Sequence, residues 1–186
     1  MQPEDIGSQA GTEAADWRWE CARHASHRVQ EMMDSGVPRS EILAVLVNAA
    51  EQVAGNRAVC SILVVDSRGL LRNAASPNLP ADYLTAIDGL KPDPRVGTCA
   101  AAAATGSMVV TCDFQADDKW AELRHLPMSL GFVGAWSMPI KSSNGKVMGT
   151  FGTYFRERRS PTPEEVRSVE VLVAAARSVL EEVGKR

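Results

Sequence analysis

The sequence predicts an α+β domain in which a central antiparallel sheet carries helices on one face, and three observations support this fold class. Apolar residues recur at three- and four-residue spacing in long segments near both ends, as in amphipathic helices. Shorter apolar segments between them are rich in β-branched residues and are separated by turn residues, as in strands. The chain has 186 residues and is 45% hydrophobic, which suits one compact domain.

The N-terminal part of the chain changes character twice. Residues 1–15 are polar and lack apolar periodicity, so we expect a flexible tail. A helix is expected next, because apolar residues recur at helical spacing until the Gly36-Val37-Pro38 break. Ser40 is placed to cap a second helix that ends at Gly55. We therefore divide the chain into a tail (1–15), an N-terminal helix (16–37) and a domain over 38–186.

The middle of the chain predicts the sheet. The pair Asn144-Gly145, flanked by apolar segments, is a strong signal for a tight hairpin. Gly106 is placed to end a short Ala-rich helix. The expected strands cover 57–65, 70–75, 107–112, 134–140 and 146–155, and the expected short helices cover 80–90 and 99–105.

The last helix has an unusually clear start. Thr162 is an N-cap, Pro163 suits the first helical position, and Glu165 completes a capping box. Its apolar residues alternate three and four apart, as in a heptad seam: Val166, Val169, Val173, Ala176, Leu180 and Val183. This seam either docks on the sheet or forms a two-chain bundle with the N-terminal helix, and we favour the homodimer.

Composition bears on partners and location. The net charge is −3 and the basic residues are scattered, so we expect no binding to nucleic acid. No apolar run is long enough to span a bilayer and no signal sequence is recognisable, so we expect a cytoplasmic protein with no membrane contact. The four cysteines lack CxxC spacing, which favours free thiols.

One ordered set of motifs carries a family resemblance. It runs from Gly97-Thr98-Cys99 through Asp113 and Trp120 to the segments GAWSMPI and GTFGTYF. This pattern, over about 39–180, resembles a GAF domain, and more narrowly the GAF sensors that precede histidine kinases and cyclic-di-nucleotide enzymes in bacterial signalling proteins. The resemblance implies a small-molecule pocket between the sheet and the 113–130 loop. We expect a stand-alone sensor, or the sensory part of a longer protein, that signals to a separate protein such as a histidine kinase.

The candidate ligand-binding residues follow from the resemblance and from residue chemistry. An indole such as that of Trp120 offers a flat apolar wall with one N–H donor. Strand alternation puts Thr150, Gly152 and Tyr154 on one face, and a glycine in a strand leaves room for a ligand. The full set is Tyr83, Cys99, Asp113, Trp120, Leu123, Trp136, Met138, Thr150, Gly152 and Tyr154. Trp136 is equally compatible with plain core, and Asp113 with a turn cap.

Three other functions stay open. Cys99 opens a helix whose dipole is expected to lower the thiol pKa, and Gly97-Thr98-Cys99 is similar to the cysteine loop of GAF enzymes that reduce free methionine sulfoxide. The 115–123 loop has no second cysteine, so we expect no enzyme and no catalytic residue. Some GAF domains bind haem through a loop histidine, so the resemblance makes His125 a candidate haem ligand. Haem is therefore the one cofactor that we name as an alternative. A ligand-free dimerisation module would fill its own pocket with Trp120 and Trp136.

Overall fold

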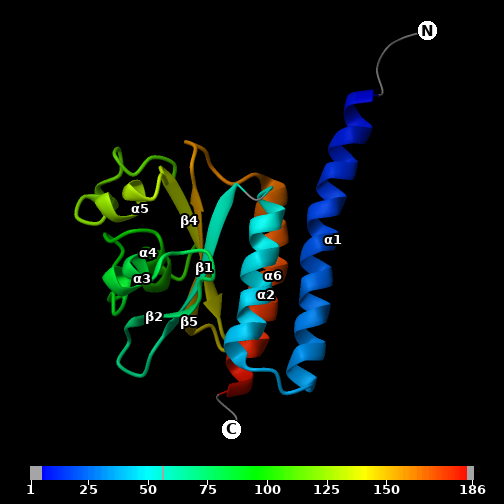
Figure 1. Cartoon of the computed structure of the whole chain (residues 1–186), viewed down its shortest axis with the longest axis horizontal. Coiled ribbons are helices and arrows are strands. Elements are labelled where there is room, and N and C mark those ends of the chain that lie inside the picture. Colours follow the sequence, from blue (N-terminus) through cyan, green and yellow to red (C-terminus); the bar gives the residue numbers. More distant parts are fainter. Residues whose placement is uncertain (1–5, 56, 184–186) are drawn as a thin grey trace.

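The computed structural model describes residues 6–55 and 57–183, with side chains described for 17–55 and 57–182. Its centre is a five-stranded sheet in the order β2-β1-β5-β4-β3, with every neighbouring pair antiparallel. The strands are β1 (Ala58–Val65), β2 (Leu71–Ala75), β3 (Val109–Thr111), β4 (Gly134–Lys141) and β5 (Val147–Phe155). The predicted antiparallel α+β class is confirmed, but the expectation that helices lie on one face of the sheet is wrong, because short helices in the connecting loops cover the other face (Figure 1).

Helices lie on both sides of this sheet (Figure 1). The long helices α2 (Arg39–Val53) and α6 (Pro163–Val183) cover one face, and α1 (Ile6–Asp34) packs on their outer side. The other face carries the short helices α3 (Ala81–Ile87), α4 (Cys99–Thr105), η1 (Asp118–Trp120) and α5 (His125–Ser129). We call these the helix face and the loop face. No helix within the described residues is long and apolar enough to cross a bilayer.

The start of α1 differs from the sequence expectation. The helix begins at Ile6 rather than at residue 16, so most of the segment expected to be a flexible tail has a helical backbone. Residues 1–5 lie outside the described part of the chain. A polar, acidic segment of this kind lacks the apolar periodicity by which a helix is recognised in sequence, which explains the difference.

Helix α6 confirms the predicted capping box. The Glu165 backbone N–H donates to Thr162 Oγ1 at 3.2 Å, and the Thr162 N–H donates to Glu165 Oε2 at 2.8 Å. The apolar side of α6 is buried within the chain against α1, α2 and the sheet, with Val169, Leu172 and Ala176 at most 2% exposed. Docking within the chain therefore accounts for Val169, Ala176 and Leu180 of the seam, whereas Val166 and Val173 are only partly buried. The homodimer stays a prediction.

A buried carboxylate joins the two sides of the fold. Glu51 of α2 is 9% exposed; its Oε1 accepts from the Cys60 N–H at 2.9 Å and its Oε2 accepts from Asn78 Nδ2 at 2.6 Å. Burial raises the pKa of Glu51 above its ordinary value. Asn78 lies in the turn that leads into α3, so this carboxylate fixes a helix-face element relative to a loop-face element.

Candidate functional site

The interior of the loop face is filled by aromatic side chains. Tyr83 of α3 donates its hydroxyl to Tyr154 of β5 at 2.8 Å, and their rings meet edge to face at 5.9 Å. Phe114 and Trp120 lie 4.3 Å apart between ring centroids, and Phe132 packs on Tyr154 at 5.4 Å. All five are buried. The structure therefore brings three predicted ligand residues together, but they fill the space beneath the loop.

Trp120 is held in place by a short hydrogen-bond chain. Its Nε1 donates to Thr111 Oγ1 at 3.2 Å, and that hydroxyl donates to Asp117 Oδ2 at 2.6 Å. Lys119 Nζ forms an ion pair with the same carboxylate at 2.7 Å. On the opposite side, a Cβ at Gly97 would lie only 3.6 Å from the indole ring, so the glycine loop packs closely on Trp120. The indole is 4% exposed and closes the space between loop and sheet.

Cys99 belongs to a buried thiol–hydroxyl cluster. Its Sγ lies 3.1 Å from Ser137 Oγ, which donates to Thr98 Oγ1 at 2.9 Å. Ser61 Oγ beside them is buried and has no hydrogen-bond partner among the described residues. A Cβ at Gly152 would lie 2.8 Å from Cys99 Sγ. The glycine of β5 therefore makes room for the thiol, where we had expected it to make room for a ligand.

The pKa of Cys99 moves opposite to the sequence expectation. Burial raises the pKa of the thiol, and the hydrogen bond with Ser137 offsets this only in part. The N-terminus of α4 was expected to lower it, but the thiol is removed from water and the protonated form is favoured. Cys99 therefore lacks the exposed thiolate that a nucleophile requires.

A groove opens at the surface beside Trp120, between the 90–96 loop and the 118–123 segment. Its volume is about 540 Å³. Its apolar wall is Leu90, Val96, Ala121 and Leu123. Its charged rim is Lys91, Asp93, Arg95, Asp118, Lys119 and Glu122. The Gly97 N–H donates to the Lys119 carbonyl at 2.8 Å and ties the two sides together. We call this the loop groove.

Of the predicted ligand residues, only Leu123 lines the loop groove. Trp136 and Met138 lie on the helix face in the core with α2 and α6, so the interpretation of Trp136 as plain core is the one that the structure supports. Asp113 accepts from the Gln115 N–H at 2.9 Å as a turn cap, and its other oxygen pairs with Arg158 Nε at 2.7 Å. Thr150 is fully buried in β5. His125, the haem candidate, is exposed at the first position of α5 and outside the groove lining.

The charged rim was missed by the sequence reasoning. Lys91, Asp93 and Arg95 alternate with two prolines in a loop, and such charged residues are ordinarily solvated. Only their proximity to Lys119 and Glu122 makes them part of a concave surface. The sequence feature that could have indicated this groove is the glycine at position 97. Its positive φ of 53° allows the turn that brings the two segments together.

The family follows from the match of the chain to a known domain. The family model described as GAF domain matches residues 37–181. The chain belongs to the GAF domain family. The resemblance based on Gly97-Thr98-Cys99 and the later motifs is thereby confirmed.

This GAF domain is similar in sequence to a protein named as a sensor and similar in fold to solved structures. It is 32% identical over 160 residues to a methyl sulfide methyltransferase-associated sensor of Methanosarcina acetivorans; the match covers 86% of this chain and 16% of that protein. A GAF sensor protein from Burkholderia vietnamiensis has a TM-score of 0.70 at 12% identity, covering 91% of this chain and 99% of the other. The substrate complex of free methionine-R-sulfoxide reductase from Neisseria meningitidis has a TM-score of 0.69 at 17% identity, covering 90% of each chain. The two solved structures share the fold.

Proposed function

We propose that this GAF domain is a non-enzymatic sensor that binds a small molecule at the loop groove and passes the signal to α6. The similarity to a protein named as a sensor supports the sensory role. The groove supports this location, because it combines an apolar wall with a charged rim. A ligand with an apolar body of a few carbons and a polar end fits this combination of Leu90, Leu123 and Lys91.

Three arginines after β5 supply the path of the signal. Arg156 Nη1 donates to the Leu130 carbonyl at 2.6 Å, and its guanidinium lies 4.6 Å from the Phe132 ring centroid. Arg158 pairs with Asp113 at 2.7 Å. The segment after β5 therefore contacts both ends of the loop that runs from Asp113 to Phe132. A rearrangement of that loop would change the contacts of this segment.

The third arginine connects the same segment to α6. Arg159 Nη1 and Nη2 donate to Glu165 Oε2 and Oε1 at 2.6 and 2.8 Å, a bidentate pair. The guanidinium carbon also lies 3.8 Å from the Phe155 ring centroid. Glu165 is 5% exposed and sits in the first turn of α6. This connection from loop to helix is the observation that carries the proposal.

The remaining parts of the proposed function concern assembly. We propose a cytoplasmic homodimer whose α6 delivers the output to a separate signalling protein or to a further part of the same chain. The 16% share of the longer relative fits a sensory segment within a larger signalling protein. The protonated, buried thiol of Cys99 supports a non-enzymatic role.

The test begins with native mass spectrometry of the protein isolated from its own cells, compared with its denatured mass. A retained small molecule identifies the ligand, which is then used for hydrogen exchange of the first turn of α6 in the wild type and in Arg158→Ala. We expect the ligand to change this exchange about tenfold in the wild type and to bind Arg158→Ala without that change. Arg167→Ala is the matched control, because Arg167 pairs with Glu164 on α6 and leaves the loop untouched. Equal responses in all three proteins would contradict the arginine path.

A further inference from the structure

Two buried hydrogen-bond donors on the helix face have no acceptor. Trp136 Nε1 and Ser168 Oγ are enclosed, and neither forms a hydrogen bond within the part of the chain that the structure describes. The two residues are only 2% and 1% exposed. A buried N–H or O–H group without an acceptor destabilises the folded state, and such groups are rare in native proteins. Their presence here therefore needs an explanation.

Both donors lie beside the carboxylate of Glu165. Trp136 of β4 and Glu165 of α6 line the same narrow gap between the sheet, α2 and α6. Ser168 follows Glu165 by three residues on α6, and this spacing places two side chains on the same face of a helix. The carboxylate of Glu165 is therefore a neighbour of both donors, although it accepts a hydrogen bond from neither of them.

In this structure the segment after β5 occupies the carboxylate. Both oxygens of Glu165 accept from Arg159, and Oε2 also accepts from the Thr162 N–H at 2.8 Å. Arg159 belongs to the same segment as Arg156 and Arg158, which contact the loop over the sheet. If Arg159 moved away with this segment, a carboxylate that is 5% exposed would lose its cation. A buried carboxylate in that position needs new donors.

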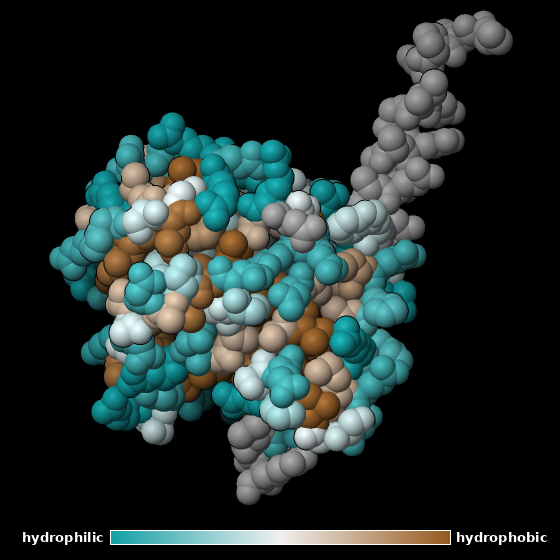
Figure 2. Space-filling model, viewed as in Figure 1, coloured by the Kyte–Doolittle hydropathy of each residue, from teal (hydrophilic) through white to brown (hydrophobic). Residues whose placement is uncertain are grey.

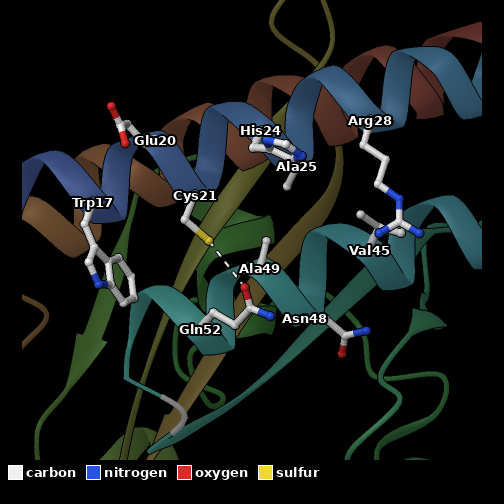
Figure 3. Close-up of a pocket in the computed structure, with 10 residues that line it drawn as sticks. All are labelled: Trp17, Glu20, Cys21, His24, Ala25, Arg28, Val45, Asn48, Ala49 and Gln52. Atoms are coloured by element: carbon white, nitrogen blue, oxygen red, sulfur yellow. Dashed lines mark hydrogen bonds between the residues drawn. The ribbon is translucent and has the colours of Figure 1, made fainter.

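The gap beside Trp136 is closed on the side of α2. It is too narrow to hold a water molecule, and Ala50 and Val53 of α2 form part of its lining. A larger hollow, of about 720 Å³, lies between α1 and α2, where apolar residues reach the surface (Figure 2). Other residues of α2, among them Asn48 and Gln52, line that hollow (Figure 3), so it does not open onto Trp136. A protein group is therefore the acceptor that this indole N–H requires.

We propose that Trp136 Nε1 and Ser168 Oγ are a second set of donors for Glu165, which accepts from them when Arg159 withdraws. In the present state the carboxylate has its cation, and the two donors lack an acceptor. In the second state the cation is lost, but both donors are satisfied and offset part of that loss. The two states therefore lie closer in free energy than the breaking of an isolated buried ion pair would place them. A two-state element requires such closeness.

This inference rests on the arginine path of the proposed function and gives that path a second state. Trp136 pairs with Thr153 of β5, and Thr153 pairs with Cys60 of β1, so the indole belongs to a row of residues across the middle of the sheet. Glu165 lies in the first turn of α6. A carboxylate that exchanges Arg159 for the indole would therefore connect the start of α6 to the central strands instead of to the segment after β5.

The first experiment records the indole N–H signals of the full chain by two-dimensional NMR, with Trp136→Phe identifying the signal of Trp136. Arg159→Met removes the cation, so we expect this signal to move downfield and its exchange with solvent to slow at least about tenfold. Arg159→Lys keeps a charge without the planar fork and should move the signal part of the way. Adding Glu165→Met to Arg159→Met removes the acceptor and should reverse the change.

Arg167→Met is the matched control for the NMR experiment. Arg167 pairs with Glu164 one residue before Glu165, so its loss changes the charge of the same helical turn without freeing the buried carboxylate. We expect the signal of Trp136 to stay in place in this variant. A signal that Arg159→Met and Arg159→Lys both leave unchanged overturns the proposal, and so does an equal change in Arg167→Met.

The second experiment measures urea unfolding of the wild type, Ser168→Ala, Arg159→Met and the double variant. In the wild type Ser168 Oγ has no acceptor, so Ser168→Ala should change the unfolding equilibrium constant less than about threefold. In the Arg159→Met background the hydroxyl donates to Glu165, so the same substitution should raise that constant at least about tenfold. Ser178→Ala is the matched control, because Ser178 Oγ donates to the Ala174 carbonyl further along α6. Equal effects of Ser168→Ala in the two backgrounds overturn the role of Ser168.

The outcomes separate this inference from the proposed function. If a retained ligand changes the exchange of α6 while Arg159→Met leaves the signal of Trp136 in place, the sensor stands and the second set of donors is wrong. If Arg159→Met moves that signal but no ligand changes the exchange of α6, the second set of donors stands and the proposed sensor is wrong.

Discussion

The packing of Gly152 against Cys99 gives the sharpest test of the loop-face interior. A methyl group at Gly152 would lie 2.8 Å from Cys99 Sγ, 3.0 Å from Ser61 Oγ and 3.5 Å from Ser137 Oγ. The first two distances are well inside van der Waals contact. The strand cannot retreat, because β5 is paired with β1 on one side and β4 on the other at this position. The Gly152→Ala variant must therefore displace the thiol or distort α4.

The expected size of this effect comes from overpacking. Inserting one methyl group into a rigid core costs roughly 1–3 kcal/mol of unfolding free energy. Removing the sulfur in Cys99→Ala costs about 1–2 kcal/mol, through lost burial and the lost contact with Ser137. In the double variant the new methyl group occupies the space that the sulfur leaves. We therefore expect the double variant to be about as stable as Cys99→Ala alone, with a coupling energy that equals the roughly 1–3 kcal/mol cost of Gly152→Ala.

The assay is urea unfolding of the wild type, the two single variants and the double variant. The free energies of unfolding are compared with one common m-value, the slope of free energy against urea concentration. Gly149→Ala is a useful comparison, because a Cβ there would lie 2.3 Å from the Leu63 backbone oxygen and no side-chain truncation relieves that clash. It should stay destabilised in the Cys99→Ala background. Additive effects of Gly152→Ala and Cys99→Ala would refute the reasoning, since they would mean that the two groups do not share one space.

Two further predictions test the turn at Asp66 and the loop that carries Trp120. The Leu70 N–H and the Arg72 guanidinium lower the pKa of Asp66 from 3.8 to about 2. Its contribution to stability is therefore present above pH 3.8 and lost as the pH falls toward 2, and thermal unfolding of Asp66→Asn should show a smaller loss over this window than the wild type. Thr111→Val leaves the buried indole N–H of Trp120 without its partner and removes one hydrogen bond from Asp117, which keeps its ion pair with Lys119, so it should cost about 1–3 kcal/mol in urea unfolding. A variant as stable as the wild type would show that the hydrogen-bond chain does not hold Trp120.

Local patterns in the sequence were enough for the framework of the fold. The β4–β5 hairpin follows from Asn144-Gly145, and Gly145 has the expected positive φ of 84°. The start of α6 follows from Thr162 and Glu165, because both capping hydrogen bonds join residues three apart. Each signal resides within a few residues, so no knowledge of the tertiary structure was needed.

The candidate site was harder to predict because it depends on long-range packing. Strand alternation placed Gly152 and Tyr154 on one face, but it does not say which face meets the loops, and for Trp136 it left a ligand contact and plain core equally open until the packing was known. The pKa of Cys99 was misjudged for the same reason: a helix N-terminus is a local feature, whereas burial under Ser137 and β5 is not. The rim of the loop groove joins residues such as Asp93 and Glu122, which no local pattern connects.

The closed interior constrains how the proposed sensor binds a ligand. A ligand confined to the loop groove contacts Lys119 and Leu123 and leaves Trp120 in place, whereas a deeper ligand must displace the indole and break its bond to Thr111. If the displaced form is about 1% populated, the apparent affinity of a deep ligand is about a hundredfold weaker than its intrinsic affinity. The Thr111→Val variant raises that population, so it tightens binding of a deep ligand and leaves a groove ligand unchanged. The effect of Thr111→Val on the binding affinity therefore decides whether the ligand leaves Trp120 in place or displaces it.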